Sequence, residues 1–155
     1  MSTTLDADGM RALVDAHSEG EQSRNWPQAL ATMGPAGHYE FYPFRLRISG
    51  AEAITEMWTR IFAEEGTLRC FNVDYIDVDS VEFSESVGDD SLVHIMAASF
   101  LAEDGERRRS SNVVRYRFEG DLMVSETLWV CSTLERYLGT VFDESFRALP
   151  GVEEI

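Results

Sequence analysis

The N-terminal part of the chain has apolar and polar residues at a helical spacing. Leu5, Met10, Leu13 and His17 recur near the 3.6-residue period of an amphipathic helix. This pattern predicts a helix over residues 5–24, with the side chains of the stripe facing the core.

Two further helices are predicted before the strands begin. Asn25 can cap a helix and Pro27 suits a first helical turn, which predicts a short helix over residues 28–33. A third helix is predicted over residues 51–65, where Gly50 ends the preceding strand. Its apolar stripe consists of Ile54, Met57, Trp58, Ile61 and Phe62.

Alternating and aromatic runs predict strands in the rest of the chain. Residues 38–42 and 45–49, separated by Pro43, are typical of a short hairpin. Turn-forming residues then separate four longer predicted strands, which cover residues 68–83, 92–102, 109–119 and 122–133.

Helices followed by a run of strands indicate an α+β fold. Residues 134–138 predict a helical turn stopped by Gly139, and we expect the tail 140–155 to be draped or frayed. With no repeat or linker, residues 1–155 are interpreted as one domain with its core at about 5–139.

The charge balance narrows the possible partners. The chain has 13 Lys plus Arg against 28 Asp plus Glu, a net charge of −15. Such a chain repels nucleic acid and anionic membrane surfaces. The N-terminus lacks the features of a signal peptide, and no apolar run approaches membrane-spanning length. A cytoplasmic location is therefore expected.

Metal and cofactor motifs are weak. The three histidines, His17, His38 and His94, show no ligand spacing, and Cys70 and Cys131 lie far apart in apolar runs. The sequence has no glycine-rich phosphate loop. We therefore expect no metal and no cofactor.

Several stretches resemble the nuclear transport factor 2-like superfamily, and in particular its SnoaL-like (polyketide cyclase and ketosteroid isomerase-like) proteins. They are residues 25–33, 39–43, 49–54, 116–121 and 134–139. The resemblance implies a cone-shaped fold, in which three N-terminal helices pack on a strongly bent, mostly antiparallel sheet and enclose a pocket. It also implies a homodimer formed through the outer sheet face.

The resemblance allows a transfer of site positions from ketosteroid isomerases. His17 takes the place of an oxyanion-binding tyrosine, Tyr42 that of the general base, and Val114 that of a second donor. Trp129 matches an aromatic residue of the pocket wall. Because the base and the second donor are missing, the resemblance argues against steroid isomerase chemistry.

His17 and Glu21 form the sharpest local signal. They are four residues apart on one helix and therefore share a face. An imidazole held by a carboxylate is a usable acid–base unit near neutral pH. The alternative is an ion pair on the helix surface. Tyr42 completes the candidate catalytic set, because a phenol can orient a substrate oxygen.

Strand alternation suggests residues for the pocket wall. Asn112, Val114 and Tyr116 share a face, and Trp129 shares one with Thr127 and Ser125. Candidate substrate-binding residues are therefore Leu13, Tyr39, Trp58, His94, Asn112, Val114, Tyr116 and Trp129.

Two of the positions on these strands carry another interpretation. Glu126 falls on the face opposite Trp129, so we expect it outside the pocket, as a residue of the subunit interface. His94 lies in an apolar strand, where a core histidine is the commoner outcome.

Two functions remain open. The first is a cofactor-independent enzyme acting on a small hydrophobic or polycyclic molecule by acid–base chemistry, of the isomerase, dehydratase, cyclase or epoxide hydrolase type. The second is a non-catalytic binding or dimeric assembly domain of the same fold. Fold alone does not choose between them.

Overall fold

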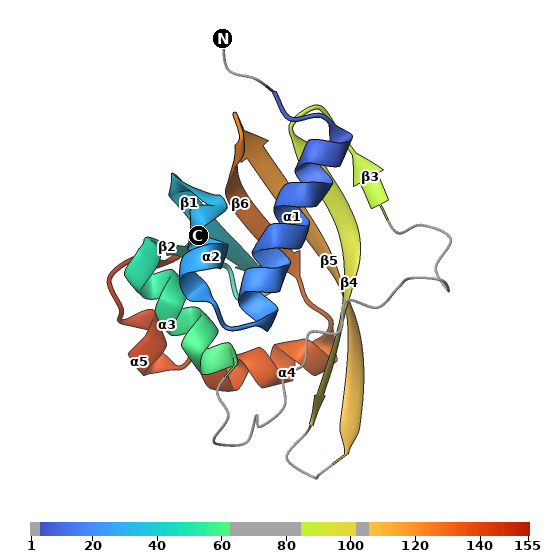
Figure 1. Cartoon of the computed structure of the whole chain (residues 1–155). Coiled ribbons are helices and arrows are strands. Elements are labelled where there is room, and N and C mark those ends of the chain that lie inside the picture. The colour runs from blue at the N-terminus through green and yellow to red at the C-terminus, as the bar shows by residue number, and fades with distance from the viewer. Residues whose placement is uncertain (1–3, 63–84, 102–105) are drawn as a thin grey trace.

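The computed structural model describes residues 4–62, 85–101 and 106–155. Helices cover one face of a curved sheet, as the α+β expectation requires (Figure 1). The helices α1, α2 and α3 lie over this face, and α4 crosses one end of the sheet. None of the described helices is long and apolar enough to cross a membrane.

The first two helices begin at residues that cap them. The Asp6 side chain accepts a hydrogen bond from Gly9 N and begins α1, Ala7–Gln22. Asn25 caps α2, Trp26–Ala31, by accepting from Gln28 N. The predicted helix 5–24 is confirmed with slightly narrower bounds. The second helix begins and ends two residues earlier than predicted.

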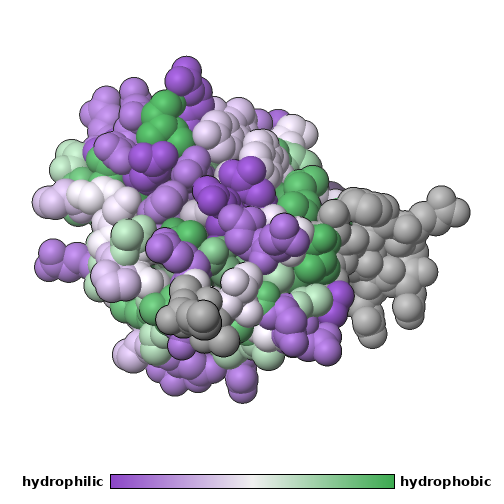
Figure 2. Space-filling view, turned by 90° about the horizontal axis from the view of Figure 1, so that it is seen from above, coloured by the Kyte–Doolittle hydropathy of each residue, from purple (hydrophilic) through white to green (hydrophobic). Residues whose placement is uncertain are grey.

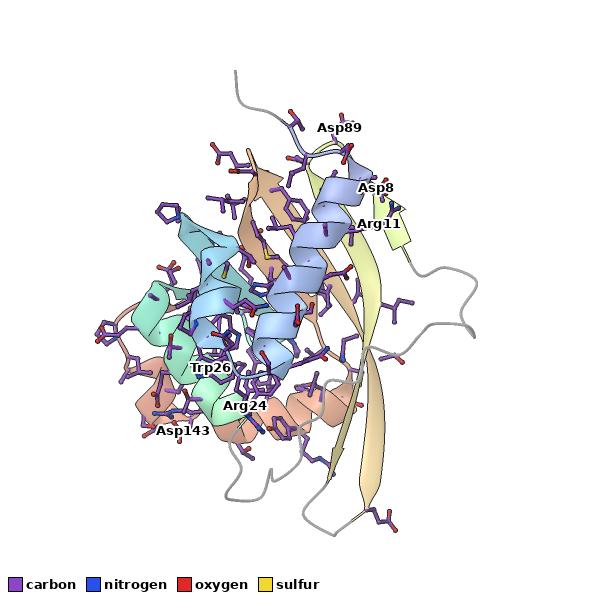
Figure 3. The ribbon with its side chains drawn as sticks, viewed as in Figure 1. Asp8, Arg11, Arg24, Trp26, Asp89 and Asp143 are labelled. Atoms are coloured by element: carbon purple, nitrogen blue, oxygen red, sulfur yellow. The ribbon has the colours of Figure 1, made fainter. Side chains whose placement is uncertain are left out.

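The third helix, α3, spans Ala51–Ile61 and agrees with the prediction over the described residues. Its predicted apolar stripe is buried, so it packs toward the sheet. The indole of Trp58 is almost fully buried and stacks on Trp26, which begins α2 and lies near Arg24 at the helix ends (Figure 3).

Seven described strands form one sheet in the order β3-β4-β5-β6-β1-β2-β7. All neighbouring strands are antiparallel except β1 and β6. The predicted strand over residues 68–83 lies outside the described residues. The strands are β1 Met33–Tyr42, β2 Leu46–Ser49, β3 Glu85–Val87, β4 Ser91–Leu101, β5 Arg107–Glu119, β6 Leu122–Trp129 and β7 Val152–Glu154.

The parallel pair β1 and β6 sets the position of the site. Tyr39 lies opposite Glu126, and Phe41 lies opposite Leu128. Residues opposite each other in neighbouring strands point to the same face of the sheet. Both pairs therefore point toward the helices, whereas Tyr42 and its partner Trp129 point away from them.

The C-terminal end differs from the prediction. The strand β6 ends at Trp129 instead of residue 133, and α4 spans Ser132–Val141, so Gly139 lies inside a helix rather than stopping it. The apolar residues Leu134, Leu138 and Val141 are buried at helical spacing, which outweighs the cost of about 1 kcal/mol for a helical glycine.

The tail is not frayed. Asp143 caps the short helix α5, Glu144–Arg147, and the Phe146 side chain is fully buried. The last strand, β7, then pairs with β2, with Arg47 opposite Glu153. Burial of Phe146 and the backbone hydrogen bonds to β2 explain why this segment is ordered.

Polar side chains cover most of the face seen in Figure 2, and its apolar residues form small patches. On α1 the exposed side carries an ion pair, in which Arg11 lies 2.9 Å from Asp8 (Figure 3). Exposed pairs of this kind contribute at most about 1 kcal/mol. The groups of chemical interest are buried.

Candidate functional site

His17 lies on the buried face of α1, where only 1% of its surface is exposed. Its Nδ1 lies 3.1 Å from Ala29 O and 2.7 Å from Thr32 Oγ1. The Thr32 hydroxyl itself donates to Ala29 O at 2.7 Å. Because a carbonyl only accepts hydrogen bonds, this arrangement assigns a proton to Nδ1.

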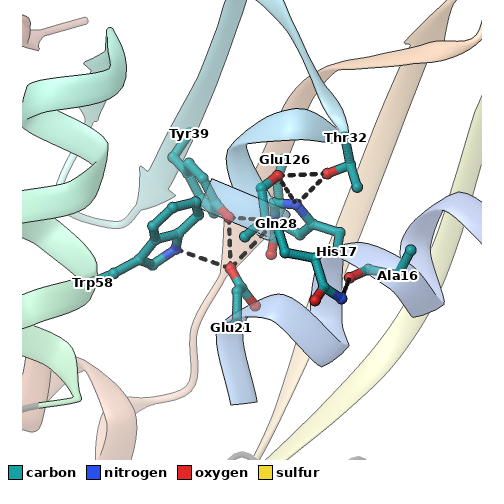
Figure 4. Close-up of polar contacts among 9 residues, drawn as sticks. Ala16, His17, Glu21, Gln28, Thr32, Tyr39, Trp58 and Glu126 are labelled. Carbon is teal, nitrogen blue, oxygen red and sulfur yellow. Dashed lines mark hydrogen bonds and ion pairs between the residues drawn. The ribbon is translucent and has the colours of Figure 1, made fainter. Parts of the chain in front are cut away.

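The other ring nitrogen of His17 faces three oxygens from three elements (Figure 4). Nε2 lies 2.6 Å from Tyr39 Oη, 3.3 Å from Glu21 Oε1 and 3.3 Å from Glu126 Oε2. Two carboxyl groups and a phenol thus surround one imidazole edge. All four side chains are buried.

The two carboxyl groups differ in how they are bonded. Glu21 Oε1 accepts from the Tyr39 hydroxyl at 2.6 Å and from Trp58 Nε1 at 3.0 Å. Glu126 Oε2 is buried and has no partner with hydrogen-bond geometry among the described residues. Its contact with His17 Nε2, at 3.3 Å, is an ion pair. Glu21 is held firmly, whereas Glu126 keeps a free oxygen.

This difference appears in the pKa values. Burial raises the pKa of Glu126, the negative charge of Glu21 raises it further, and contacts with His17 and Tyr39 oppose the rise, so that it reaches about 7. Burial also disfavours the charged form of Glu21, but the charge of His17 and hydrogen bonds from Tyr39 and Trp58 lower its pKa overall.

His17 is held in its charged form. Burial lowers its pKa, but the negative charge of Glu21 and the contacts with Glu126 raise it more, to about 10. Burial, followed by the charges of Glu126 and Glu21, raises the pKa of Tyr39 well above its ordinary value. At neutral pH the network therefore contains an imidazolium, a neutral phenol, an ionised Glu21 and a half-protonated Glu126.

A small cavity reaches this network from the apolar side. Its volume is about 40 Å³, room for roughly three water molecules. Glu21, Tyr39 and Glu126 are its polar lining groups, and no Lys or Arg occurs among the described residues around it. The apolar lining residues are Phe41, Met57, Trp58, Ile61, Phe62, Leu128, Leu134 and Leu138.

The same three side chains have the donor types that a metal ion requires. The ligand atoms of His17, Glu21 and Glu126 lie within 4.8 Å of one another, and they form the candidate metal group within the described ranges. However, two N–H and O–H donors converge on Glu21 Oε1, where they compete with a cation for its lone pairs. The donor set therefore fits a proton network better than a metal centre.

The structure brings four of the predicted site residues together. His17, Glu21, Tyr39 and Trp58 form one hydrogen-bonded network. The inward orientation expected for His17 is confirmed, and the surface ion pair with Glu21 is wrong. Tyr39, expected only in the wall, binds both His17 and Glu21.

Tyr42 and Trp129 lie on the opposite face of the sheet. Their rings stack with centroids 5.9 Å apart, and the Tyr42 hydroxyl donates to Glu40. Trp129 is 40% exposed. Their expected places in the pocket are wrong, because the parallel pairing of β1 and β6 directs both side chains away from the helices.

The remaining predicted residues do not line the cavity, in so far as the structure describes it. Asn112, Val114 and Tyr116 are buried on the expected face of β5, and Asn112 Oδ1 accepts from Cys131 N. Leu13 is partly buried against the core. The His94 backbone pairs with Val114, and its side chain lies outside the described residues.

Glu126 was missed by the sequence reasoning, which placed it on the outer face. It is only 3% exposed and shares the network with His17. Ser125 and Thr127, which alternate with it, are also buried. Because side chains on both faces of β6 are buried here, the sequence has no alternation of apolar and polar residues that would indicate the inner face. The pairing of Glu126 with Tyr39 identifies it.

No family model matches the chain, and no curated protein matches it. Its similarity is to solved structures, and one of these is a putative SnoaL-like polyketide cyclase from Jannaschia sp. CCS1. This structure has a TM-score of 0.64 and 13% identity, covering 96% of this chain and 97% of that one.

Two further structures have the same arrangement. A nuclear transport factor 2-like protein from Burkholderia thailandensis has a TM-score of 0.60 and 14% identity, covering 81% of this chain and 93% of that one. A protein with a ketosteroid isomerase-like fold from Catenulispora acidiphila, in complex with trimethylamine, has a TM-score of 0.59 and 13% identity, covering 75% and 82%. The chain therefore has the nuclear transport factor 2-like fold, shared with ketosteroid isomerase-like and SnoaL-like proteins.

Proposed function

We propose that the chain is a cofactor-independent acid–base enzyme in which Glu126 transfers a proton to or from a small hydrophobic substrate. The observation that carries the proposal is the state of Glu126. This carboxyl group lines an apolar cavity, has a free buried oxygen and has a pKa of about 7. A group with a pKa near the working pH is suited to general acid–base catalysis.

His17 has a positioning role in this proposal. Its Nδ1 proton is bound by Ala29 O and Thr32, and its Nε2 proton faces Tyr39 and the two carboxyl groups. With a pKa of about 10 it stays charged at neutral pH. It therefore balances the charges of the carboxyl groups, and the role of proton carrier passes from His17 to Glu126.

Tyr39 is not free to bind a substrate oxygen. Its hydroxyl proton is directed to Glu21 at 2.6 Å, and its oxygen accepts from the His17 imidazolium at 2.6 Å. Protonated Glu126 is therefore the donor available to a substrate, and ionised Glu126 is the acceptor. This single group can move a proton between two positions of one molecule, as isomerisation or dehydration requires.

The similar structures support a small-molecule pocket. One is a putative SnoaL-like polyketide cyclase, and another was solved in complex with trimethylamine. At 13% identity these likenesses extend to fold alone, so the reaction type is argued from Glu126.

Deuterium exchange tests the proposal without knowledge of the natural substrate. Small hydrophobic ketones are incubated with the protein in heavy water, and NMR follows exchange of the protons beside the carbonyl group. We expect protein-dependent exchange that Glu126→Gln slows by about 10²–10⁴-fold. The Tyr42→Phe variant, altered on the opposite face, is the matched control and should exchange like the wild type.

The cavity size favours a second candidate, a non-catalytic binding domain. A volume of about 40 Å³ is small beside the roughly 300–1,000 Å³ of ordinary ligand pockets. A binding domain would take up a ligand from the same panel without any exchange. Binding with exchange no faster than in Glu126→Gln would select this candidate.

We also propose that the chain forms a homodimer through the outer sheet face. Val113 and Trp129 are 42% and 40% exposed on this face, and Arg115 lies over the Trp129 ring. Large exposed apolar residues are typical of interfaces. Light scattering should give a mass of two chains for the wild type and of one chain for the Trp129→Glu variant.

The expected cytoplasmic location stays a prediction.

A further inference from the structure

We infer that the cavity binds a small organic cation, an ammonium group on an apolar body, with the ammonium group paired to Glu126. The inference rests on the proposed function for the choice of pocket, and it names the class of substrate. Three independent features of the site support it: its charge balance, its free oxygen and its aromatic walls.

When Glu126 is ionised, the charge balance of the site leaves one negative charge uncompensated. His17 contributes one positive charge, and Glu21 and ionised Glu126 contribute one negative charge each, so a single negative charge remains. No Lys or Arg lies among the described lining residues. Buried charges need a partner, so among the described residues the ionised site lacks one positive charge.

The free oxygen fixes where the cation lies. Glu21 Oε1 is already occupied by the donors of Tyr39 and Trp58. Glu126 Oε2 has no hydrogen-bond partner among the described residues, although it is 3.3 Å from the charged His17 ring. An ammonium N–H requires one free carboxylate oxygen, whereas a metal ion requires several ligands in a fixed geometry.

The walls suit an alkylated cation. Rings of Tyr39, Phe41, Trp58 and Phe62 line the cavity. The faces of aromatic rings attract cations, and the attraction is stronger where water is excluded. The net charge of −15 adds a long-range attraction for cations. The small volume limits the ligand to a short alkyl group.

The ammonium group and the proton compete for the same oxygen. Glu126 is faced by His17 and Glu21 from α1 and by Tyr39 from β1, and Tyr116 lies beside it on β5. Glu126 holds a proton below its pKa of about 7. As the pH is raised toward this value, the affinity for the cation should therefore increase about tenfold per pH unit. Above this value the affinity should become constant.

A pair of matched probes tests the inference. Isopropylammonium and isopropanol share one apolar body and differ in charge, and an alkylammonium stays protonated to about pH 10. We expect calorimetric or NMR titration of the protein above about pH 7 to show that isopropylammonium binds at least tenfold more tightly than isopropanol. Equal affinity for the two probes, or an ammonium affinity independent of pH, would overturn the inference.

Three variants locate the binding. Glu126→Gln should abolish the preference for the ammonium, whereas Glu119→Gln, an exposed carboxyl on β5, makes the same change in net charge and should retain it. Phe62→Leu keeps an apolar wall without the ring and should weaken ammonium binding about three- to tenfold. Unchanged ammonium binding by folded Glu126→Gln contradicts the inference.

The two proposals can fail separately. Ammonium binding lost in Glu126→Gln, without exchange of any ketone, leaves the inference standing and removes the acid–base function. Ketone exchange that depends on Glu126, without any preference for the ammonium over isopropanol, leaves the acid–base function standing and removes the inference.

Discussion

Nε2 of His17 and Oε2 of Glu126 lie 3.3 Å apart, and this contact joins α1 to the inner face of β6. One partner is charged across the neutral range, and the other changes charge near pH 7. The stability of the fold and the chemistry of the pocket therefore depend on the same protons.

We predict that the protein is most stable in mild acid, at about pH 5. The pKa of His17 rises from 6.5 to about 10 on folding, so its contribution is complete below 6.5 and is lost as the pH rises through 10. The pKa of Glu126 rises from 4.5 to about 7, so stability also falls between these values. The pKa of Glu21 is lowered on folding, so its stabilising contribution is lost only as the pH falls below the ordinary value of 4.5.

Thermal unfolding across the pH range measures this effect. The midpoint temperature should decline steadily from about pH 5 to about pH 9, because the folded chain keeps protons that the unfolded chain has released. Each such proton lowers the free energy of unfolding by about 1.4 kcal/mol per pH unit. In Glu126→Gln the decline between about pH 5 and about pH 7 should be smaller. A midpoint that rises over this interval would contradict the assigned charges.

We predict that His17→Gln is strongly destabilising. Without the imidazolium, Glu21 and Glu126 face each other in a buried site, and breaking a buried pair costs about 3–5 kcal/mol. Adding Glu126→Gln to this variant removes one of the two like charges and should restore part of the stability. Denaturant titrations of the two single variants and the double variant form a thermodynamic cycle, and strict additivity would argue against the contact.

Tyr39→Phe and Tyr42→Phe should behave differently, although each removes one hydroxyl from β1. The Tyr39 hydroxyl joins His17 and Glu21 in the buried network, so its loss should cost about 1–3 kcal/mol. The Tyr42 hydroxyl contacts only partly buried Glu40 at 3.3 Å, so its loss should cost under about 1 kcal/mol. Equal losses of unfolding free energy would place the network elsewhere.

Two glycine substitutions test the helix packing that holds His17. A Cβ at Gly20 would lie 2.7 Å from Ala29 N, so Gly20→Ala should force α1 and α2 apart and cost about 1–3 kcal/mol. A Cβ at Gly139 would meet nothing within 4 Å. Gly139→Ala should stabilise α4 by up to about 1 kcal/mol. If Gly20→Ala and Gly139→Ala changed the free energy of unfolding in the same direction, this packing would be contradicted.

The fold could be predicted from the sequence because its signals are local. The stripe of α3 and the Asn25 cap of α2 are properties of neighbouring residues, and both are confirmed. Gly139 misled the prediction because a helix end was inferred from one residue. Buried Phe146 and the pairing of β7 with β2 depend on contacts with distant parts of the chain.

The site could be predicted only in part, for a related reason. His17 and Glu21 are one helical turn apart, so periodicity placed them together on the inner face. Glu126 and Tyr39 meet through the parallel pairing of β1 and β6. A change of one residue in the expected orientation moves every side chain of a strand to the other face. The expected orientation placed Trp129 inside and Glu126 outside, the reverse of what the structure shows, and it placed Tyr42 inside beside Tyr39, although the two side chains lie on opposite faces.

The pairing of β7 with β2 has a consequence for how the molecule meets its neighbours in a crowded solution. Without β7, the backbone groups along β2 would be open to strands of other chains. With β7 in place, the outermost strand at this edge of the sheet is β7 itself, which is three residues long and carries the exposed Glu153 and Glu154. A short, negatively charged edge is a poor template for aggregation, so the last residues of the chain help to keep it dispersed.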